Sequence, residues 1–264
     1  MAIRPSVEGM TAEQLAALRD AWTKSQALVD DRGFGYWAGV HGLPLPISCR
    51  HSPRTQNDFL FLPWHRAYLY FFERSLQDRN KAAAVPWWDW TSDGSHTRGI
   101  PEAFDIKKLG KVRNPLREAR VAISPDDVKR VRAQAPGTIT PGKVPYTRRD
   151  PDIPDELPRK ATIDSVLAAP TFEDFSTRVE NVHNAVHGWV GGTMTLVPVA
   201  AYDPIFWAHH AAIDRVWYLW QMSPFGVDPP AAMMDTVLDP FPMTVRQTLN
   251  INNLGYDYAV EVIH

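Results

Sequence analysis

The sequence has one cysteine, Cys49, among 264 residues, so no disulfide can form within the chain. A secreted fold held together by disulfides is therefore excluded, and such low cysteine content is typical of a reducing cytoplasm. Residues 1–6 lack the apolar core of a signal peptide. We expect a cytoplasmic protein, with export alongside a separate carrier protein as the alternative.

Long apolar runs and an excess of one charge are also missing. No run of about 18 apolar residues is present, which predicts no membrane span. The formal net charge is −2, so the chain lacks the basic balance typical of proteins that bind nucleic acid. Internal repeats and low-complexity segments are absent as well. A chain of 264 residues can bury a sizeable core, and we expect one domain over 1–264.

Helical periodicity is clear in four segments. The first follows a capping-box pattern of Thr11 and Gln14. The last follows Asp203-Pro204, where Asp suits the N-cap and Pro the first helical position. A short helical piece is also expected to end after His41. The four helices are predicted over 11–31, 63–80, 171–188 and 204–222.

The remaining segments predict loops and short strands. Residues 91–160 have nine prolines and many charges, which indicates a long surface excursion with short helices at most, for example near 125–135. A short strand is predicted over 193–199. The alternation of Tyr256, Tyr258, Val260 and Val262 predicts another strand at the end of the chain.

Six of the nine histidines fall into two groups with the spacing of metal ligands. On the predicted helix 171–188, His183 and His187 lie one turn apart, and Glu180 and Asn184 share their face. In the next helix, His210 belongs to an apolar stripe that points into the core, where a bare imidazole needs a partner. The other group lies upstream and consists of His41, His51 and His65.

The neighbours of His210 refine this interpretation. His209 points elsewhere on the helix, so only one of these two histidines is expected to bind the same ion. Asp214 lies one turn beyond His210, where a carboxylate could orient its imidazole. A single histidine is more often a hydrogen-bonded core residue than a ligand, but six in this arrangement argue for two neighbouring metal ions. The other three histidines, His96, His209 and His264, are interpreted as non-ligands.

The type of ligand narrows the choice of metal. Imidazole sites suit zinc, copper, iron or nickel. A structural zinc ion would have four protein ligands, often sulfur, and a di-iron bundle would have several carboxylate ligands. Two groups of three histidines instead leave an open position on each ion. The spacing alone does not decide between copper and zinc.

Four motifs together resemble the type-3 copper proteins, the group of tyrosinases, catechol oxidases and haemocyanins. The resemblance covers most of the chain apart from 91–160. Phe61–Leu69 is similar to the family's first-copper signature, and Asp203–Asp214 is very similar to its second. Pro86–Trp90 and Tyr256-Asp257-Tyr258 also resemble family motifs. The resemblance implies a mainly α fold with a four-helix core around a dinuclear site, long loops and a few short strands.

The resemblance also implies the site residues and cofactors. It implies two copper ions as cofactors and O2 as the co-substrate. One ion would be bound by His41, His51 and His65, and the other by His183, His187 and His210. Cys49 matches members that carry a thioether to the histidine at position 51, the alternative being a free thiol. Glu180 and Asn184 resemble an acid–amide pair that holds a proton-accepting water, although Glu180 could instead only orient His183. The substrate pocket is expected at Gly188, Val197 and Phe206.

Three functions follow from this resemblance. The first is a tyrosinase that hydroxylates small monophenols and oxidises o-diphenols to o-quinones, with a copper-delivery protein as a further partner. The second is a catechol or o-aminophenol oxidase without the hydroxylation step, and the third is a haemocyanin-like oxygen-binding protein. The chain ends six residues after Tyr258, so we expect no C-terminal shielding domain, which favours an enzyme. A dizinc hydrolase is a distant alternative. The sequence does not determine whether the excursion 91–160 covers the dinuclear site.

Overall fold

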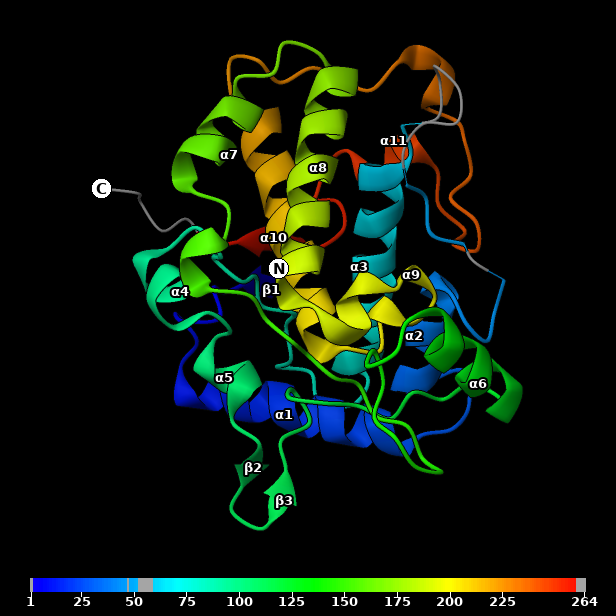
Figure 1. The fold of residues 1–264 in the computed structure, drawn as a ribbon. Coiled ribbons are helices and arrows are strands. Elements are labelled where there is room, and N and C mark those ends of the chain that lie inside the picture. Colours follow the sequence, from blue (N-terminus) through cyan, green and yellow to red (C-terminus); the bar gives the residue numbers. More distant parts are fainter. Residues whose placement is uncertain (1, 47, 52–58, 260–264) are drawn as a thin grey trace.

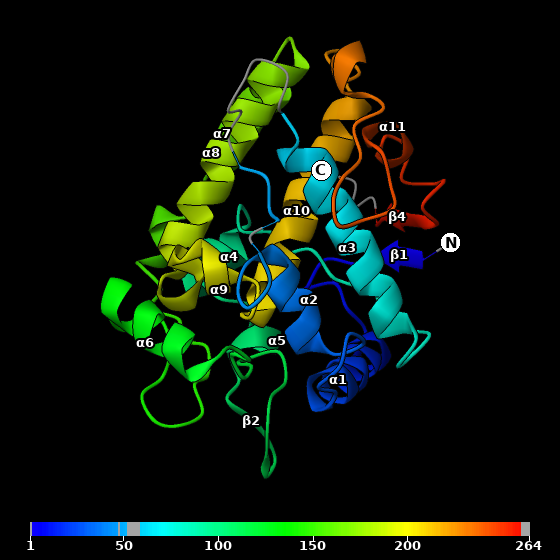
Figure 2. The ribbon, with the colours of Figure 1, turned by 90° about the vertical axis from the view of Figure 1, so that its right-hand side faces the viewer.

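Four helices pack around the centre of the fold (Figures 1 and 2). The computed structural model describes residues 2–46, 48–51 and 59–259. In both views three of these helices run side by side, and the fourth, α2, lies near their lower ends. The predicted mainly α fold with a four-helix core is confirmed. The helices are α2 (Phe34–His41), α3 (Phe61–Gln77), α8 (Phe172–Val190) and α10 (Pro204–Gln221).

The ends of the central helices follow from local sequence. α8 begins after Thr171, whose hydroxyl accepts a hydrogen bond from the backbone N–H of Asp174. α10 begins after Asp203, whose carboxylate accepts a bond from the N–H of Ile205, with Pro204 at the first helical position. These two starts are those predicted. α3 begins at Phe61, two residues before the predicted start.

The other elements cover the ends and sides of this core, and all except α1 and α6 are short. β1 pairs in parallel with β4, and β2 pairs antiparallel with β3. Of the predicted terminal strand, β4 confirms Tyr256 and Tyr258, whereas Val260 and Val262 lie outside the described residues. The helices are α1 (Ala12–Ala27), α4 (Asp93–Arg98), α5 (Glu102–Asp105), α6 (Pro125–Gln134), α7 (Lys160–Leu167), α9 (Val197–Ala200) and α11 (Val245–Thr248); the 3-10 turns are η1 (Pro154–Glu156), η2 (Gly192–Thr195) and η3 (Ala231–Met233); the strands are β1 (Ala2–Arg4), β2 (Lys108–Leu109), β3 (Val112–Arg113) and β4 (Tyr256–Tyr258).

The strand predicted over 193–199 is wrong. This segment forms η2 and α9 instead. Pro198 has no backbone N–H to donate to a strand ladder. Thr193 is also fixed by two hydrogen bonds with the backbone of Arg148. Its N–H donates to the Arg148 carbonyl at 2.7 Å, and its hydroxyl accepts from the Arg148 N–H at 2.8 Å. The predicted helix 11–31 is shorter than expected, because α1 ends at Ala27.

The excursion 91–160 is fixed to the core by a buried ion pair. The guanidinium of Arg149 donates to both carboxylate oxygens of Asp203 at 2.9 Å, and also to the carbonyls of Phe104 and Leu116. Because Asp203 caps α10, the excursion is joined to the helix that carries His210. The short helix predicted near 125–135 is confirmed as α6.

No described helix combines the length and the apolar character needed to cross a membrane.

Candidate dinuclear metal centre

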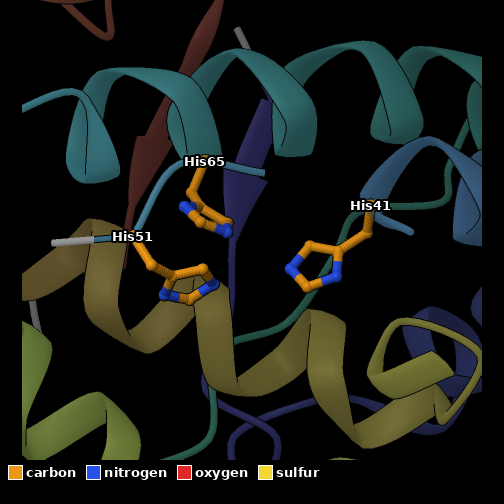
Figure 3. A group of neighbouring side chains, drawn as sticks. All are labelled: His41, His51 and His65. Atoms are coloured by element: carbon orange, nitrogen blue, oxygen red, sulfur yellow. The ribbon is translucent and has the colours of Figure 1, made fainter. Parts of the chain in front are cut away.

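The structure brings the six predicted histidines together in two triads. Within each triad the candidate ligand atoms all lie within 4.8 Å of one another. His41 ends α2, His65 lies in the first turns of α3, and His51 lies in the segment between them, so three separate parts of the chain supply one triad (Figure 3). The second triad joins His183 and His187 from α8 with His210 from α10.

Backbone carbonyls orient three of the imidazoles. Nδ1 of His41 lies 3.0 Å from the carbonyl oxygen of Val197, and Nδ1 of His65 lies 2.8 Å from that of Phe61. Nδ1 of His187 lies 2.7 Å from the carbonyl oxygen of Met194. A carbonyl can only accept, so each Nδ1 carries the proton and each Nε2 presents a lone pair to the centre. Sequence reasoning missed these partners, because any residue supplies a carbonyl.

The Nε2 atoms have the arrangement that metal ions require. In the first triad, Nε2 of His41, His51 and His65 is buried and has no hydrogen-bond partner. In the second, Nε2 of His210 lies 3.1 Å from Nε2 of His183 and 3.4 Å from that of His187. An ion bound at about 2.0–2.1 Å holds imidazole nitrogens roughly 3.3 Å apart. The donor set therefore fits a metal ion in each triad.

The environment of five imidazoles favours their neutral form, which is the form that binds metal. Burial is the main cause that lowers the pKa of His41, His65, His183 and His210 well below its usual range, and neighbouring imidazoles add to it. Burial lowers the pKa of His187 to about 4. At neutral pH these side chains compete weakly for protons and stay available to a metal.

Glu180 and Asn184 both contact histidines of the two triads. Oε1 of Glu180 lies 3.4 Å from Nδ1 of His51, and Oδ1 of Asn184 lies 3.0 Å from Nδ1 of His183. Glu180 is buried, whereas Asn184 is exposed. The helix spacing thus places both side chains where the sequence predicted them, beside the two triads.

The role predicted for Asp214 is wrong. Its carboxylate accepts hydrogen bonds from Arg4, Arg66, Tyr256 and Tyr258. Nδ1 of His210 has no hydrogen-bond partner. Two buried guanidinium groups attract the carboxylate more strongly than a neutral imidazole does. Asp214 therefore joins α10 to β1, α3 and β4 instead of orienting the imidazole.

A cavity of about 380 Å³ opens beside both triads. Val197 and Gly188 line it as predicted, and Val197 is 40% exposed. The prediction for Phe206 is wrong, because its side chain is fully buried under the rings of His41 and His210. An aromatic residue in a core stripe packs on the ligands instead of reaching the opening. Residues that the sequence did not indicate also line the cavity, namely Met194, Thr195 and Ala200.

The remaining predicted residues lie outside the triads. Cys49 is half-buried, and burial raises the pKa of its thiol to about 12; its thioether to His51 stays a prediction. His96 is on α4, where Nε2 lies 3.3 Å from the carbonyl of Pro158. His209 is fully buried but belongs to neither triad. His264 lies outside the described residues.

Comparisons with known sequences point to one family. Residues 31–223 match the family described as the common central domain of tyrosinase. A tyrosinase from Streptomyces lincolnensis is 37% identical over 176 residues, 61% of this chain and 62% of the relative. Haemocyanin units G and H from Sepia officinalis are 30% identical over 229 residues, 83% of this chain and 37% of the relative. The chain thus spans less than two thirds of either relative.

Solved structures show the same fold. A functional unit of octopus haemocyanin has a TM-score of 0.77 and 27% identity, over 98% of this chain and 68% of that one. A tyrosinase from Burkholderia thailandensis at high pH has a TM-score of 0.75 and 23% identity, over 99% of this chain and 74% of that one. The second likeness shows the fold alone.

Proposed function

The chain belongs to the tyrosinase family of type-3 copper proteins, and we propose that it is a phenol oxidase that hydroxylates monophenols and oxidises o-diphenols to o-quinones with O2. The observation that carries this proposal is the open cavity that borders both histidine triads and has Glu180 and Asn184 in its wall. Two copper ions held by the triads supply the O2 chemistry when bound. An oxygen carrier needs no such opening for an organic substrate.

Hydroxylation requires that the monophenol first loses its proton. A free phenol has a pKa of about 10, so a positioned base is needed near neutral pH. We assign this task to the Glu180 carboxylate, which accepts the proton through a water held between it and the Asn184 amide. The contact of each side chain with a histidine supports the assignment, because it fixes both groups at the wall of the cavity.

The size and mouth of the cavity suit a small phenol. A volume of about 380 Å³ lies at the lower end for small-molecule sites. A Cβ atom added at Gly188 would meet no heavy atom within 4 Å, and Val197 has a short side chain. These two residues leave the approach to the triads uncrowded. A copper-delivery partner and a cytoplasmic location remain part of the proposal.

Two other functions compete with this one. The likeness to the octopus and Sepia haemocyanins favours an oxygen carrier. An oxidase restricted to catechols or o-aminophenols would use the same cavity without proton removal from a monophenol. The measurement that separates them is oxygen uptake by the copper-loaded protein, with a simple monophenol in one cell and the matching catechol in another.

Each result selects one function. Uptake in both cells with quinone formation supports the proposal. Uptake with the catechol alone overturns the hydroxylase step and leaves a catechol oxidase. Reversible O2 binding without quinone in either cell, at two copper ions per chain, overturns the enzyme in favour of an oxygen carrier.

A further inference from the structure

The six metal-binding imidazoles are held in place by different means. Nδ1 of His41, His65 and His187 faces a backbone carbonyl, as described above. Nδ1 of His210 has no partner, but the ring packs between those of His65 and Phe206, with centroids 4.4 and 4.1 Å away. Four of the rings are therefore restrained either by the main chain or by rings on their faces.

His183 has a weaker hydrogen-bonding restraint than these four. Its Nδ1 contacts only the side-chain oxygen of Asn184, which is exposed and open to competition from water. The rings of Phe61 and His51 also lie near it, at 4.8 and 5.4 Å between centroids. One face of the ring is covered by His209, with centroids 5.2 Å apart and ring planes inclined by only 16°.

His209 belongs to neither triad. It is 0% exposed, and burial lowers its pKa well below the usual range, while a contact with the backbone of His183 acts against that shift. The stacked geometry also excludes it as a shared ligand, because the lone pairs of parallel rings lie in the ring planes and do not converge. The ring is confined by the edge of His187 at 5.1 Å and by Trp90 at 6.3 Å.

We propose that His209 is a positioning residue that holds the imidazole of His183 in its metal-binding orientation by covering one face of the ring. Without a flat side chain at 209, the His183 ring gains freedom to rotate, and its Nε2 points less often at the position shared with His187 and His210. The metal ion of this triad is then held more weakly, while the triad of His41, His51 and His65 is unchanged. The inference concerns copper retention, so it does not depend on which phenol is oxidised.

The test compares two substitutions at position 209, one that keeps a flat ring and one that removes it. His209→Leu fills a similar volume but has no flat face, whereas His209→Phe keeps the face and has no ring nitrogen. Copper per chain is measured over time in the presence of a strong chelator, and the Tm of the metal-free protein is measured in parallel. We expect His209→Leu to lose one of its two copper ions about 10- to 100-fold faster, because removing a group that orients a metal ligand weakens metal affinity by about that factor. His209→Phe should stay within a few-fold of the unsubstituted protein.

The controls separate positioning from general stability. His96→Leu removes a histidine outside the site and should release both copper ions at the original rate. Equal copper retention in the Leu and Phe variants, or release of both ions together in the Leu variant, overturns the proposal. If either variant cannot be purified, His209→Asn and His209→Tyr replace the pair under the same criterion. Copper counting needs no phenol, so failure of the proposed oxidase activity would leave this result intact.

Discussion

Glu180 and His51 face each other at the wall of the cavity, with Oε1 of the carboxylate 3.4 Å from Nδ1 of the imidazole. The side chain assigned as the proton acceptor is therefore also in contact with a histidine of the first triad. Glu180 could accept a proton or orient His51, and these two roles predict different kinetic results for the substitution Glu180→Gln. The amide of a glutamine keeps an oxygen that accepts from Nδ1, but it cannot take up the phenol proton.

Glu180→Gln should reduce the hydroxylation of monophenols much more than the oxidation of catechols. Loss of a general base costs about 10²-fold or more in rate, and only the monophenol reaction requires this base. The measurement is kcat/KM for a monophenol and the matching catechol, at equal copper content. A parallel fall for both substrates would contradict the base role and leave Glu180 as a group that orients His51.

Asn184 provides the matched test of the amide. Asn184→Ala should also lower the ratio of monophenol to catechol activity, since the water loses one of its two holders. Asn181→Ala, an exposed neighbour on the same helix, should leave the ratio unchanged. An equal effect of both substitutions would show that the helix, and not the amide, is responsible.

Asp214→Asn should destabilise the fold strongly. The carboxylate lies between the buried guanidinium groups of Arg4 and Arg66, at 3.2 and 2.5 Å. Removing one partner of a buried ion pair costs about 3–5 kcal/mol, because the other charge stays buried without compensation. The free energy of unfolding in denaturant measures this cost in the metal-free protein.

An exposed ion pair serves as the control for Asp214. Asp235 pairs with Arg246 at 3.0 Å, and both side chains are mostly in water. Asp235→Asn should change the free energy of unfolding by about 0–1 kcal/mol. Similar losses in the two variants would mean that the buried network contributes no more than a surface pair.

The stability of the metal-free protein should fall between pH 6.5 and pH 4. Burial lowers the pKa of His41, His65, His183 and His210, and that of His187 to about 4, while the unfolded chain keeps a pKa near 6.5. Below pH 6.5 the unfolded chain therefore binds more protons than the folded protein does, and the free energy of unfolding falls. Asp214, whose pKa is lowered by Arg66 and Arg4 against the effect of burial, adds its own loss only below its usual pKa near 3.8. A constant Tm of the metal-free protein from pH 7 to pH 5 would contradict this prediction.

The sequence predicted well which histidines of α8 and α10 lie together, because helix spacing carries that information. His183 and His187 lie one turn apart, and the position of His210 in an apolar stripe distinguishes it from His209. The starts of α8 and α10 were also predictable, since Thr171 and Asp203 act through short local hydrogen bonds. In these cases a pattern of a few neighbouring residues determines the structure.

Contacts between distant segments could not be predicted in the same way. The partner of Asp214 is not the histidine one turn away, because Arg4 and Arg66 arrive from other elements and hold a charge that attracts the carboxylate. Residues 193–199 were predicted as a strand, but Pro198 and the contacts of Thr193 with Arg148 make them helical turns. Phe206 was expected at the opening, and packing of the other rings instead places it beneath the ligands.

Gly192→Ala should destabilise the protein and disturb the second triad. Gly192 has a φ of 54°, and an added Cβ would collide with the carbonyl oxygen of Arg148. A non-glycine residue in this region costs about 1–3 kcal/mol before any clash is counted. Gly192 begins η2, whose Met194 carbonyl orients His187, so copper retention should fall with the Tm. Gly188→Ala is the control: nothing lies within 4 Å of its added Cβ, and alanine in a helix stabilises by roughly 0.5–1 kcal/mol over glycine. The Tm of the metal-free protein should therefore fall for Gly192→Ala and stay equal or rise for Gly188→Ala. A lower Tm for Gly188→Ala than for Gly192→Ala would show that the backbone between α8 and α9 accepts a side chain at Gly192 without strain.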